Sequence, residues 1–86
     1  MLKIAFKPSF VRQVKKLSAE LQHEVIEKIE LFKHPQNHSL LKVHKLQGPL
    51  RGCHAFSVNF RFRIVFEYVS ETEVVLLAVG DHDIYK

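Results

Sequence analysis

The feature that most constrains the fold is a pair of closely spaced segments in which apolar and polar residues alternate. In the first segment, His54, Phe56 and Val58 share one parity. In the second, apolar residues occupy one parity and charged residues the other, namely Phe62, Ile64, Phe66 and Tyr68 against Arg61, Arg63 and Glu67. Alternation with a period of two is typical of half-buried antiparallel strands. The apolar parity is therefore expected to face a core, and what the arginine parity faces becomes the functional question.

The rest of the chain contains further strands and two helices. Alternation at the start of the chain predicts a first strand, and Pro8 suits the first turn of the helix that follows. Ser18 is a good N-cap for a second helix, which Pro35 would end. The expected elements are a strand at 2–6, helices at 8–17 and 18–34, a short strand or extended arm at 40–46, and strands at 53–59, 62–69 and 73–79.

This order of elements predicts one α+β domain that spans residues 1–86. An N-terminal strand and a helical hairpin would pack on a curved, mainly antiparallel sheet. The short interval at 59–61 predicts a tight hairpin between two of the strands. The strand at 73–79 is apolar at successive positions, which predicts that both of its faces are covered. The first strand could lie beside the last.

Composition narrows the class of protein. The net charge of +4 and pI near 9.4 favour a polyanionic partner such as nucleic acid, although many small stable domains are mildly basic without one. No apolar run approaches the length of a membrane span, and the first residues lack the plan of a signal peptide. The single cysteine, Cys53, allows neither an internal disulfide nor a multi-cysteine zinc site. We expect a cytoplasmic protein.

Two arginines on the polar parity are candidates for phosphate binding. Arg61 and Arg63 are spaced so that both guanidinium groups can grip one phosphate, or they can be solvated or paired with Glu67. The glycines at 48 and 52 only superficially resemble a phosphate-binding loop, because no Gly-Lys-Ser/Thr ending or helix follows. We predict a turn at 48–52.

A polar cluster follows Gly80 at the end of the last strand. His82 stands between Asp81 and Asp83, and Tyr85 follows closely. An imidazole can transfer protons at neutral pH, whereas many short polar tails are simply exposed to solvent. The remaining histidines have no context that fixes the geometry of metal ligands, so we expect no metal. We expect three of them to be solvated, namely His23, His34 and His38, and leave two open, namely His44 and His54.

Taken together, these residues resemble a known family. The pattern is Leu46-x-Gly48-x-Leu50-x-Gly52-Cys53-x-x-Phe56, then 62–66 (Phe-Arg-Ile-Val-Phe), then Val79-Gly80-x-His82-x-x-x-Lys86. It is similar to the RelE/ParE superfamily of type II toxin–antitoxin toxins, above all to the RelE and YafQ branches, over almost the whole chain. The resemblance implies an endoribonuclease that cleaves mRNA on the 70S ribosome without a metal or another cofactor. It also implies a cognate antitoxin as partner.

The resemblance also assigns roles to individual residues. Arg63 matches the strand arginine that stabilises the scissile phosphate, His82 matches the C-terminal histidine of the YafQ-like branch, and Tyr85 lies close to its terminal aromatic residue. Ala55 and Ser57 stand where the RelE branch has basic residues, so a histidine-centred site is expected. Asp81 or Asp83 would orient His82. The expected RNA-binding residues are Lys42, Lys45, Arg51, His54, Arg61 and Lys86.

Two other function classes stay open. The ParE branch has the same fold but inhibits DNA gyrase, and the missing basic residues are compatible with such an inhibitor. A toxin-like protein without activity that only binds its antitoxin is the third class. An acidic antitoxin segment is expected to bind the basic protein, because the helical hairpin offers a groove and an exposed sheet edge offers a template for strand pairing.

Overall fold

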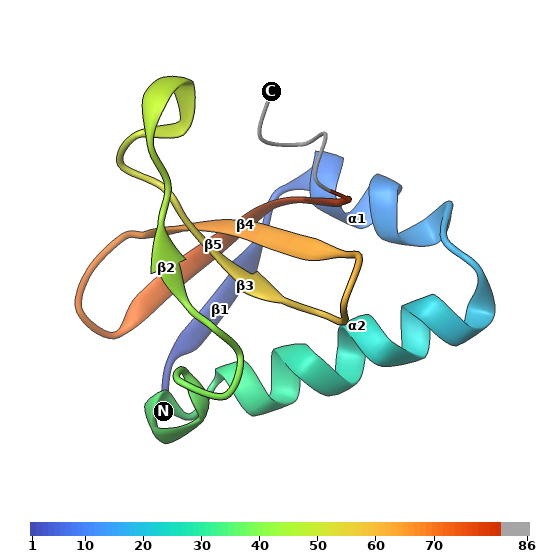
Figure 1. Ribbon diagram of the computed structural model, residues 1–86, viewed down its shortest axis with the longest axis horizontal. Coiled ribbons are helices and arrows are strands. Elements are labelled where there is room, and N and C mark those ends of the chain that lie inside the picture. The colour runs from blue at the N-terminus through green and yellow to red at the C-terminus, as the bar shows by residue number, and fades with distance from the viewer. Residues whose placement is uncertain (82–86) are drawn as a thin grey trace.

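Five strands form one sheet, and two helices pack on one of its faces (Figure 1). The computed structural model describes residues 1–81. The elements are β1 (Lys3–Phe6), α1 (Pro8–Lys15), α2 (Ala19–Phe32), β2 (His44–Lys45), β3 (His54–Ser57), β4 (Arg63–Tyr68) and β5 (Glu73–Gly80), with 3₁₀ turns at Pro35–Asn37 and Gly48–Leu50. The predicted α+β class is confirmed; β5 is one residue longer than expected, and the other elements are shorter.

The strand order in the sheet is β1-β5-β4-β3-β2. The first strand pairs in parallel with the last, with Lys3 opposite Glu73 and Phe6 opposite Leu76. All other neighbours are antiparallel, so the sheet is mainly antiparallel as predicted. Strand β5, the last strand in residues 1–81, therefore lies inside the sheet, between β1 and β4 (Figure 1).

The helices begin where their capping residues predict. Pro8 occupies the first turn of α1, where its missing N–H costs no hydrogen bond. The Ser18 hydroxyl accepts a hydrogen bond from the Leu21 N–H at 3.2 Å, which confirms it as the N-cap of α2. Helix α2 ends at Phe32, and Pro35 starts a separate 3₁₀ turn. The helices bury Phe10 on α1 and a stripe at helical spacing on α2, namely Val25, Ile29 and Phe32.

The core lies between the helices and the apolar parity of the central strands. Phe32 stacks on Phe56 with ring centroids 4.2 Å apart and meets Phe66 edge-on at 4.7 Å. Buried aromatic pairs in these geometries add to the stability gained by burying their area. The predicted core positions are confirmed at Phe56, Val58, Ile64 and Phe66, each with no exposed surface. Tyr68 has the same parity but remains 37% exposed, so burial ends before the last residue of β4.

The apolar run in β5 has a different cause from the one predicted. Val65 of β4 lies opposite Ala78, but the next residue, Phe66, lies opposite Leu76, so β5 contains one extra residue at this point. Such a bulge reverses the parity of the strand that contains it. The core residues of β5 are accordingly spaced by two and then by three, at Val74, Leu76 and Val79. The residues between them are half-buried, so full burial of both faces was the wrong interpretation.

The arm that precedes β3 is mostly irregular. Only His44 and Lys45 pair as a strand, opposite Ala55 and His54 respectively. The Leu41 carbonyl accepts a hydrogen bond from the Ser57 N–H at 2.8 Å, which ties the arm to the other end of β3. The turn at 48–52 is confirmed, and both of its glycines have positive φ, at 66° and 95°.

His38 in this arm corrects a prediction. Its ring stacks on Phe32 with centroids 4.8 Å apart, and its Nε2 lies 2.9 Å from the Phe32 carbonyl oxygen. The side chain is therefore a half-buried packing partner of the C-terminus of α2, and the expectation of a solvated loop histidine is wrong. The sequence contains no periodic signal for such a contact, because it depends on how the arm folds back.

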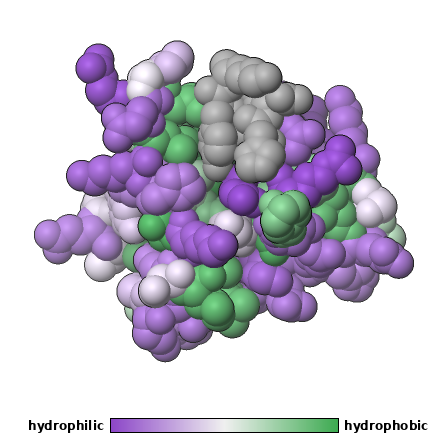
Figure 2. Space-filling view, viewed as in Figure 1, coloured by the Kyte–Doolittle hydropathy of each residue, from purple (hydrophilic) through white to green (hydrophobic). Residues whose placement is uncertain are grey.

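Most of the surface is hydrophilic, but hydrophobic areas interrupt it. On the face seen in Figure 2, hydrophilic residues predominate and the hydrophobic ones form separate patches. Several large apolar residues are exposed, namely Met1, Phe6, Val11, Ile26, Leu40, Phe60, Tyr68 and Val69. No helix in the described part of the chain is long and apolar enough to cross a membrane.

Candidate nucleic-acid interface

Arg63 lies at one end of the sheet, on its central strand. It is the first residue of β4, opposite Ser57 of β3 on one side and Gly80 of β5 on the other. Its neighbour Ile64 is fully buried beneath the helices. Because successive strand residues point to opposite faces, the Arg63 side chain leaves the sheet on the face without helices. The predicted separation of the arginine parity from the core is confirmed at this position.

The hairpin between β3 and β4 fixes the Arg63 guanidinium. Its Nη1 donates hydrogen bonds to three backbone carbonyl oxygens, those of Asn59 at 2.8 Å, Phe62 at 3.1 Å and Phe60 at 3.3 Å. A guanidinium has five N–H donors in a rigid fork. Within residues 1–81, the hydrogen bonds of Arg63 all involve Nη1, which leaves Nε and Nη2 as donors for a bound anion.

Asn59 organises the same hairpin. Its Oδ1 accepts hydrogen bonds from the backbone N–H groups of Arg61 at 2.9 Å and Phe62 at 2.8 Å, as in an Asx turn. Its Nδ2 donates to the Glu24 carboxylate at 2.8 Å, which connects the hairpin to α2. Since the Asn59 carbonyl also accepts from Arg63, one residue sets the position of the turn, the helix contact and the arginine. The sequence signal was the asparagine at the start of the predicted turn at 59–61.

Arg61 lies at the same end of the sheet, but its side chain is largely exposed. Its Nη2 is 4.0 Å from Oδ2 of Asp81, and its guanidinium lies 5.6 Å from the centre of the Phe62 ring. The Arg61 side chain is 72% exposed, and exposed pairs of this kind contribute little to stability. The pairing considered between Arg61 and Glu67 is replaced by the pairing with Asp81. Arg61 therefore remains available to a polyanion that approaches Arg63.

Four of the predicted site residues follow the described part of the chain. His82, Asp83, Tyr85 and Lys86 lie outside the described residues, so their roles stay predictions. Asp81 is the last residue described and directly follows Gly80, the residue opposite Arg63.

The other predicted RNA-binding residues form a second group away from Arg63. Lys45 and His54 are directly opposite each other in β2 and β3, and Arg51 follows the 3₁₀ turn. With Leu46, Gln47, Gly52 and Cys53 they line a groove of about 400 Å³. His54 has the parity of the buried Phe56, so its side chain lies on the opposite face of the sheet from Arg63. Lys42 is exposed and adopts a left-handed backbone conformation with φ of 57°.

The environment of His54 favours its neutral form. The ring packs against Phe66 at 5.5 Å and edge-on against Tyr68 at 5.0 Å, and its buried Nδ1 has no hydrogen-bond partner among residues 1–81. Burial is the largest cause that lowers the pKa of His54 below 6.5. The positive charges of Lys45 and, to a smaller extent, His44 lower this pKa further. At neutral pH His54 therefore brings no positive charge to the groove, whose cations are Lys45 and Arg51.

Comparison with known proteins shows which solved structures share this architecture. No protein-family model and no curated protein matches the sequence. Three solved structures match over nearly their whole length. A conserved hypothetical protein from Helicobacter pylori has a TM-score of 0.70 and 23% sequence identity, and the match covers 96% of this chain and 97% of that one. YafQ from Escherichia coli has a TM-score of 0.74 and 16% identity, with coverage of 98% and 97%, and the RelBE2 toxin–antitoxin complex from Mycobacterium tuberculosis has a TM-score of 0.71 and 20% identity, with coverage of 94% and 98%. The chain has the RelE/ParE toxin fold. At these identities the likeness establishes the RelE/ParE fold, and the chemistry must be argued from the residues of this chain.

Two positions of the RelE/ParE fold bear on that chemistry. Ala55 is fully buried, and Ser57 is half-buried opposite Arg63. Neither side chain can supply a cation beside Arg63. A second cation beside Arg63 would therefore have to come from residues other than these two, and the histidine-centred site stays a prediction.

Proposed function

We propose that this protein is the toxin of a type II toxin–antitoxin pair and that it cleaves mRNA on the ribosome without a metal ion. The observation that carries the proposal is Arg63, whose guanidinium is fixed by the hairpin carbonyls while Nε and Nη2 remain available. It lies on the face without helices, at the point where β5 leads into the predicted acid–base residues. The likeness to YafQ and to the RelBE2 toxin–antitoxin complex supports the same function.

In the proposed reaction, a ribose 2′-hydroxyl attacks the adjacent phosphorus. The bond from the 2′ oxygen to phosphorus forms, the bond to the 5′ oxygen breaks, and the products are a 2′,3′-cyclic phosphate and a 5′-hydroxyl. A base removes the 2′ proton and an acid protonates the leaving oxygen. His82 serves as one of these, oriented by Asp81 or Asp83, and Tyr85 assists by hydrogen bonding or by stacking on a base. Arg63 stabilises the charge that develops on the phosphate, with help from Arg61.

The second basic group would bind the RNA or ribosomal backbone. Lys45 and Arg51 surround the groove, His54 lies in its wall, and Lys42 and Lys86 extend the set along the chain. Phosphate contacts of this kind position a nucleic acid without reading its sequence. The proposal therefore predicts affinity for RNA that falls steeply with salt concentration.

The proposed protein partner is an acidic antitoxin. Two structures with this fold are toxin–antitoxin complexes, RelBE2 from Mycobacterium tuberculosis and YoeB–YefM from Staphylococcus aureus. In this chain β2 is the edge of the sheet and spans only two residues, so its flanks offer backbone groups to an added strand. An acidic segment that pairs there would also neutralise Lys45 and Arg51. Both partners would meet in the cytoplasm, where ribosomes are found.

A second candidate function is inhibition of DNA gyrase. Its support is the absence of cations at Ala55 and Ser57, together with the likeness to a YoeB/ParE toxin from Agrobacterium tumefaciens (TM-score 0.65, 14% identity). One experiment separates the two functions. Primer extension on ribosome-bound message should show new 5′ ends, and a supercoiling assay with gyrase should show no inhibition.

His82→Ala tests the mechanism directly. It should abolish both the new 5′ ends and growth inhibition, while circular dichroism and antitoxin binding remain those of the unchanged protein. Full toxicity of His82→Ala would refute the acid–base assignment. Inhibition of supercoiling without RNA cleavage would establish the gyrase alternative instead.

A further inference from the structure

Phe60 is the most exposed of the large apolar residues in the described part of the chain, with 96% of its surface open to solvent. It lies in the middle of the turn between β3 and β4, which the Val58 N–H closes with a hydrogen bond to the Phe62 carbonyl at 2.9 Å. Turn positions favour small or polar residues such as glycine, asparagine and serine. The ring of Phe60 adds nothing to the core, so its role is expected outside the chain.

The backbone that presents Phe60 is held in place on both sides of the ring. Asn59 Oδ1 accepts hydrogen bonds from the backbone N–H groups of Arg61 at 2.9 Å and Phe62 at 2.8 Å. The carbonyl oxygen of Phe60 itself accepts a hydrogen bond from Arg63 Nη1 at 3.3 Å. A ligand that binds the ring therefore has only the side chain of Phe60 to order, which lowers the entropic cost of binding.

The same turn places two guanidinium groups next to the ring. Arg61 follows Phe60 directly and its side chain is largely exposed, and Arg63 is bonded to the Phe60 carbonyl. Two carboxylates lie near the turn. Glu24 belongs to α2, on the other side of the sheet from the Arg63 side chain, and Asp81 makes a contact of 4.0 Å with the exposed Arg61. A ligand at the Phe60 ring therefore lies within reach of two cations.

An open aromatic ring beside guanidinium groups matches the chemistry of a single-stranded nucleic acid. Each nucleotide offers a flat base that stacks on an aromatic side chain and a phosphate that binds a cation. Phe62 is not equivalent in this respect, because it packs against the core and the Arg61 guanidinium lies 5.6 Å from the centre of its ring. Phe60 is the aromatic residue of this turn whose ring is open to a base.

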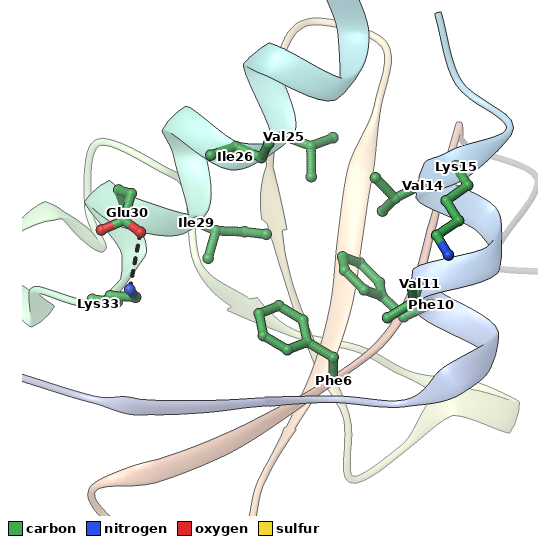
Figure 3. Close-up of a pocket in the computed structure, with 10 residues that line it drawn as sticks. All are labelled: Phe6, Phe10, Val11, Val14, Lys15, Val25, Ile26, Ile29, Glu30 and Lys33. Atoms are coloured by element: carbon green, nitrogen blue, oxygen red, sulfur yellow. Dashed lines mark hydrogen bonds and ion pairs between the residues drawn. The ribbon is translucent and has the colours of Figure 1, made fainter. Parts of the chain in front are cut away.

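A protein is the alternative partner for an exposed phenylalanine. The residues that dominate protein interfaces are normally surrounded by further contacts that exclude water. The chain has such a gathered apolar surface elsewhere: Figure 3 shows Phe6, Val11 and Ile26 around a groove of about 350 Å³ between α1 and α2. Phe60 instead stands between two polar residues of its turn, so the observations favour a nucleobase over a protein.

We propose that Phe60 stacks on a base of a single-stranded RNA whose phosphate is bound by Arg63. Arg61 then binds a neighbouring phosphate of the same strand. The inference rests on the proposed function, since it takes RNA as the nucleic acid that reaches the Arg63 end of the sheet. It adds a base-binding site that positions the strand and takes no part in proton transfer. Because every base has a flat face, Phe60 contributes to affinity without selecting a sequence.

A tryptophan at position 60 would report stacking directly. The chain contains no tryptophan, so Phe60→Trp introduces a single fluorescent indole, and a base that stacks on an indole quenches its fluorescence. The probe is a short 2′-O-methyl RNA of mixed sequence, which cannot be cleaved because it has no 2′-hydroxyl. It should quench Phe60→Trp with a dissociation constant of about 1–100 µM at low salt. The same oligomer with abasic sites throughout should leave the fluorescence unchanged.

Val69→Trp is the matched control for this measurement. Val69 is 67% exposed and lies in the turn at the other end of β4, away from Arg63. An indole at this position should not be quenched by either oligomer. Quenching of both tryptophan variants to the same extent would overturn the inference, because it would show contact with RNA all over the surface.

Anisotropy of the labelled oligomer measures the contribution of Phe60 to affinity. Phe60→Ala should raise the dissociation constant about 5–100-fold, as the loss of one stacked base does, and should leave the dependence of affinity on salt unchanged. Phe60→Leu should behave like Phe60→Ala, since leucine is apolar but has no aromatic face. Phe60→Trp should bind at least as tightly as the unchanged protein. All three should keep its melting temperature, because the side chain at position 60 is not buried.

The outcomes separate this inference from the proposed function. A Phe60→Ala protein with unchanged affinity for the RNA, or equal quenching of Phe60→Trp by the intact and the abasic oligomer, would overturn the stacking site. Loss of antitoxin binding in Phe60→Ala, with RNA affinity unchanged, would also overturn it and assign the ring to a protein. If the proposed function fails and the inference holds, primer extension shows no new 5′ ends while the uncleavable RNA still quenches Phe60→Trp.

Discussion

The side chain of Gln13 accepts a hydrogen bond at its Oε1 from the backbone N–H of Val79 at 2.9 Å, across 66 residues of sequence. Strand β1 pairs with β5 only as far as Leu76, so the edge of β5 beyond it needs another partner. Helix α1 supplies that partner with one side chain. The contact connects the helix that follows β1 to the end of β5, which leads directly to the candidate site.

Replacing Gln13 should therefore destabilise the fold more than an ordinary substitution at the surface. Gln13→Ala should lower the free energy of unfolding by about 1–2 kcal/mol, because a part-buried backbone N–H loses its acceptor. Arg12→Ala on the same helix is the control and should change it by less than about 0.5 kcal/mol, as expected for an exposed residue. Urea unfolding measures both. Equal effects of the two variants would contradict the assignment.

The contact between Asn59 and Glu24 can be tested by exchanging its donor and acceptor. Asn59→Asp keeps the acceptor for the turn but places a carboxylate beside Glu24, 2.8 Å away in the structure, and should cost about 1–3 kcal/mol. Glu24→Gln in the same chain restores a donor and should recover most of the loss. Thermal or urea unfolding of the four proteins gives the coupling energy. A coupling near zero would show that the hairpin does not depend on this contact.

Arg63 should contribute to both stability and catalysis. Arg63→Ala removes the hydrogen bonds to three hairpin carbonyls and should lower stability by about 1–2 kcal/mol, as well as slowing RNA cleavage by about 100–1000-fold. Arg63→Lys keeps the positive charge but loses the forked arrangement of N–H donors, so its cleavage rate should lie between those of the unchanged protein and Arg63→Ala. Arg61→Ala is the matched control and should slow cleavage less than about tenfold, because its pair is exposed. Single-turnover cleavage of ribosome-bound message measures the rates. A folded Arg63→Ala protein with an unchanged rate would exclude the phosphate role.

His54 makes the stability of the fold dependent on pH. Burial holds its pKa below 6.5 in the folded protein, so in mildly acidic solution the unfolded chain binds the proton and the folded protein does not. The contribution of His54 to stability is therefore present above about pH 6.5 and is lost as the pH falls toward its folded pKa. His54→Phe preserves the packing against Phe66 and Tyr68 and does not titrate. Its melting temperature should fall less than that of the unchanged protein between pH 7 and pH 5, and parallel curves would refute the role of His54.

Local patterns were sufficient to predict most of the fold. Alternation identified β3 and β4, and Ser18 and Pro8 marked the starts of the helices, because these signals depend on neighbours in sequence. The bulge in β5 was not predictable in this way. An apolar run such as 74–79 fits either a strand buried on both faces or a strand whose parity changes, and the pairing with β4 decides between them.

The candidate site was predicted only in part. The strand parity placed Arg63 away from the core, but parity cannot show that its Nη1 is bound to the hairpin. Gln13 and Asn59 were missed as positioning residues because their partners, Val79 and Glu24, lie far away in sequence. The RNA-binding residues were predicted to act together with Arg63, whereas the sheet places Arg63 and the group around Lys45 on opposite faces. Pairing registers, which no local pattern specifies, determine this division.

The parallel pairing of β1 with β5 has a consequence for the synthesis of the protein. Lys3 and Glu73 are partners, so β1 has no neighbour in the sheet until about 70 further residues have been made. Strand β5 also lies between β1 and β4. A nascent chain that ends before β5 therefore contains β1 on its own and, separately, the strands β2 to β4. The end of the sheet that positions Arg63 opposite Gly80 then forms only after translation has passed this glycine. The candidate site is therefore among the last parts of residues 1–81 to take shape during synthesis.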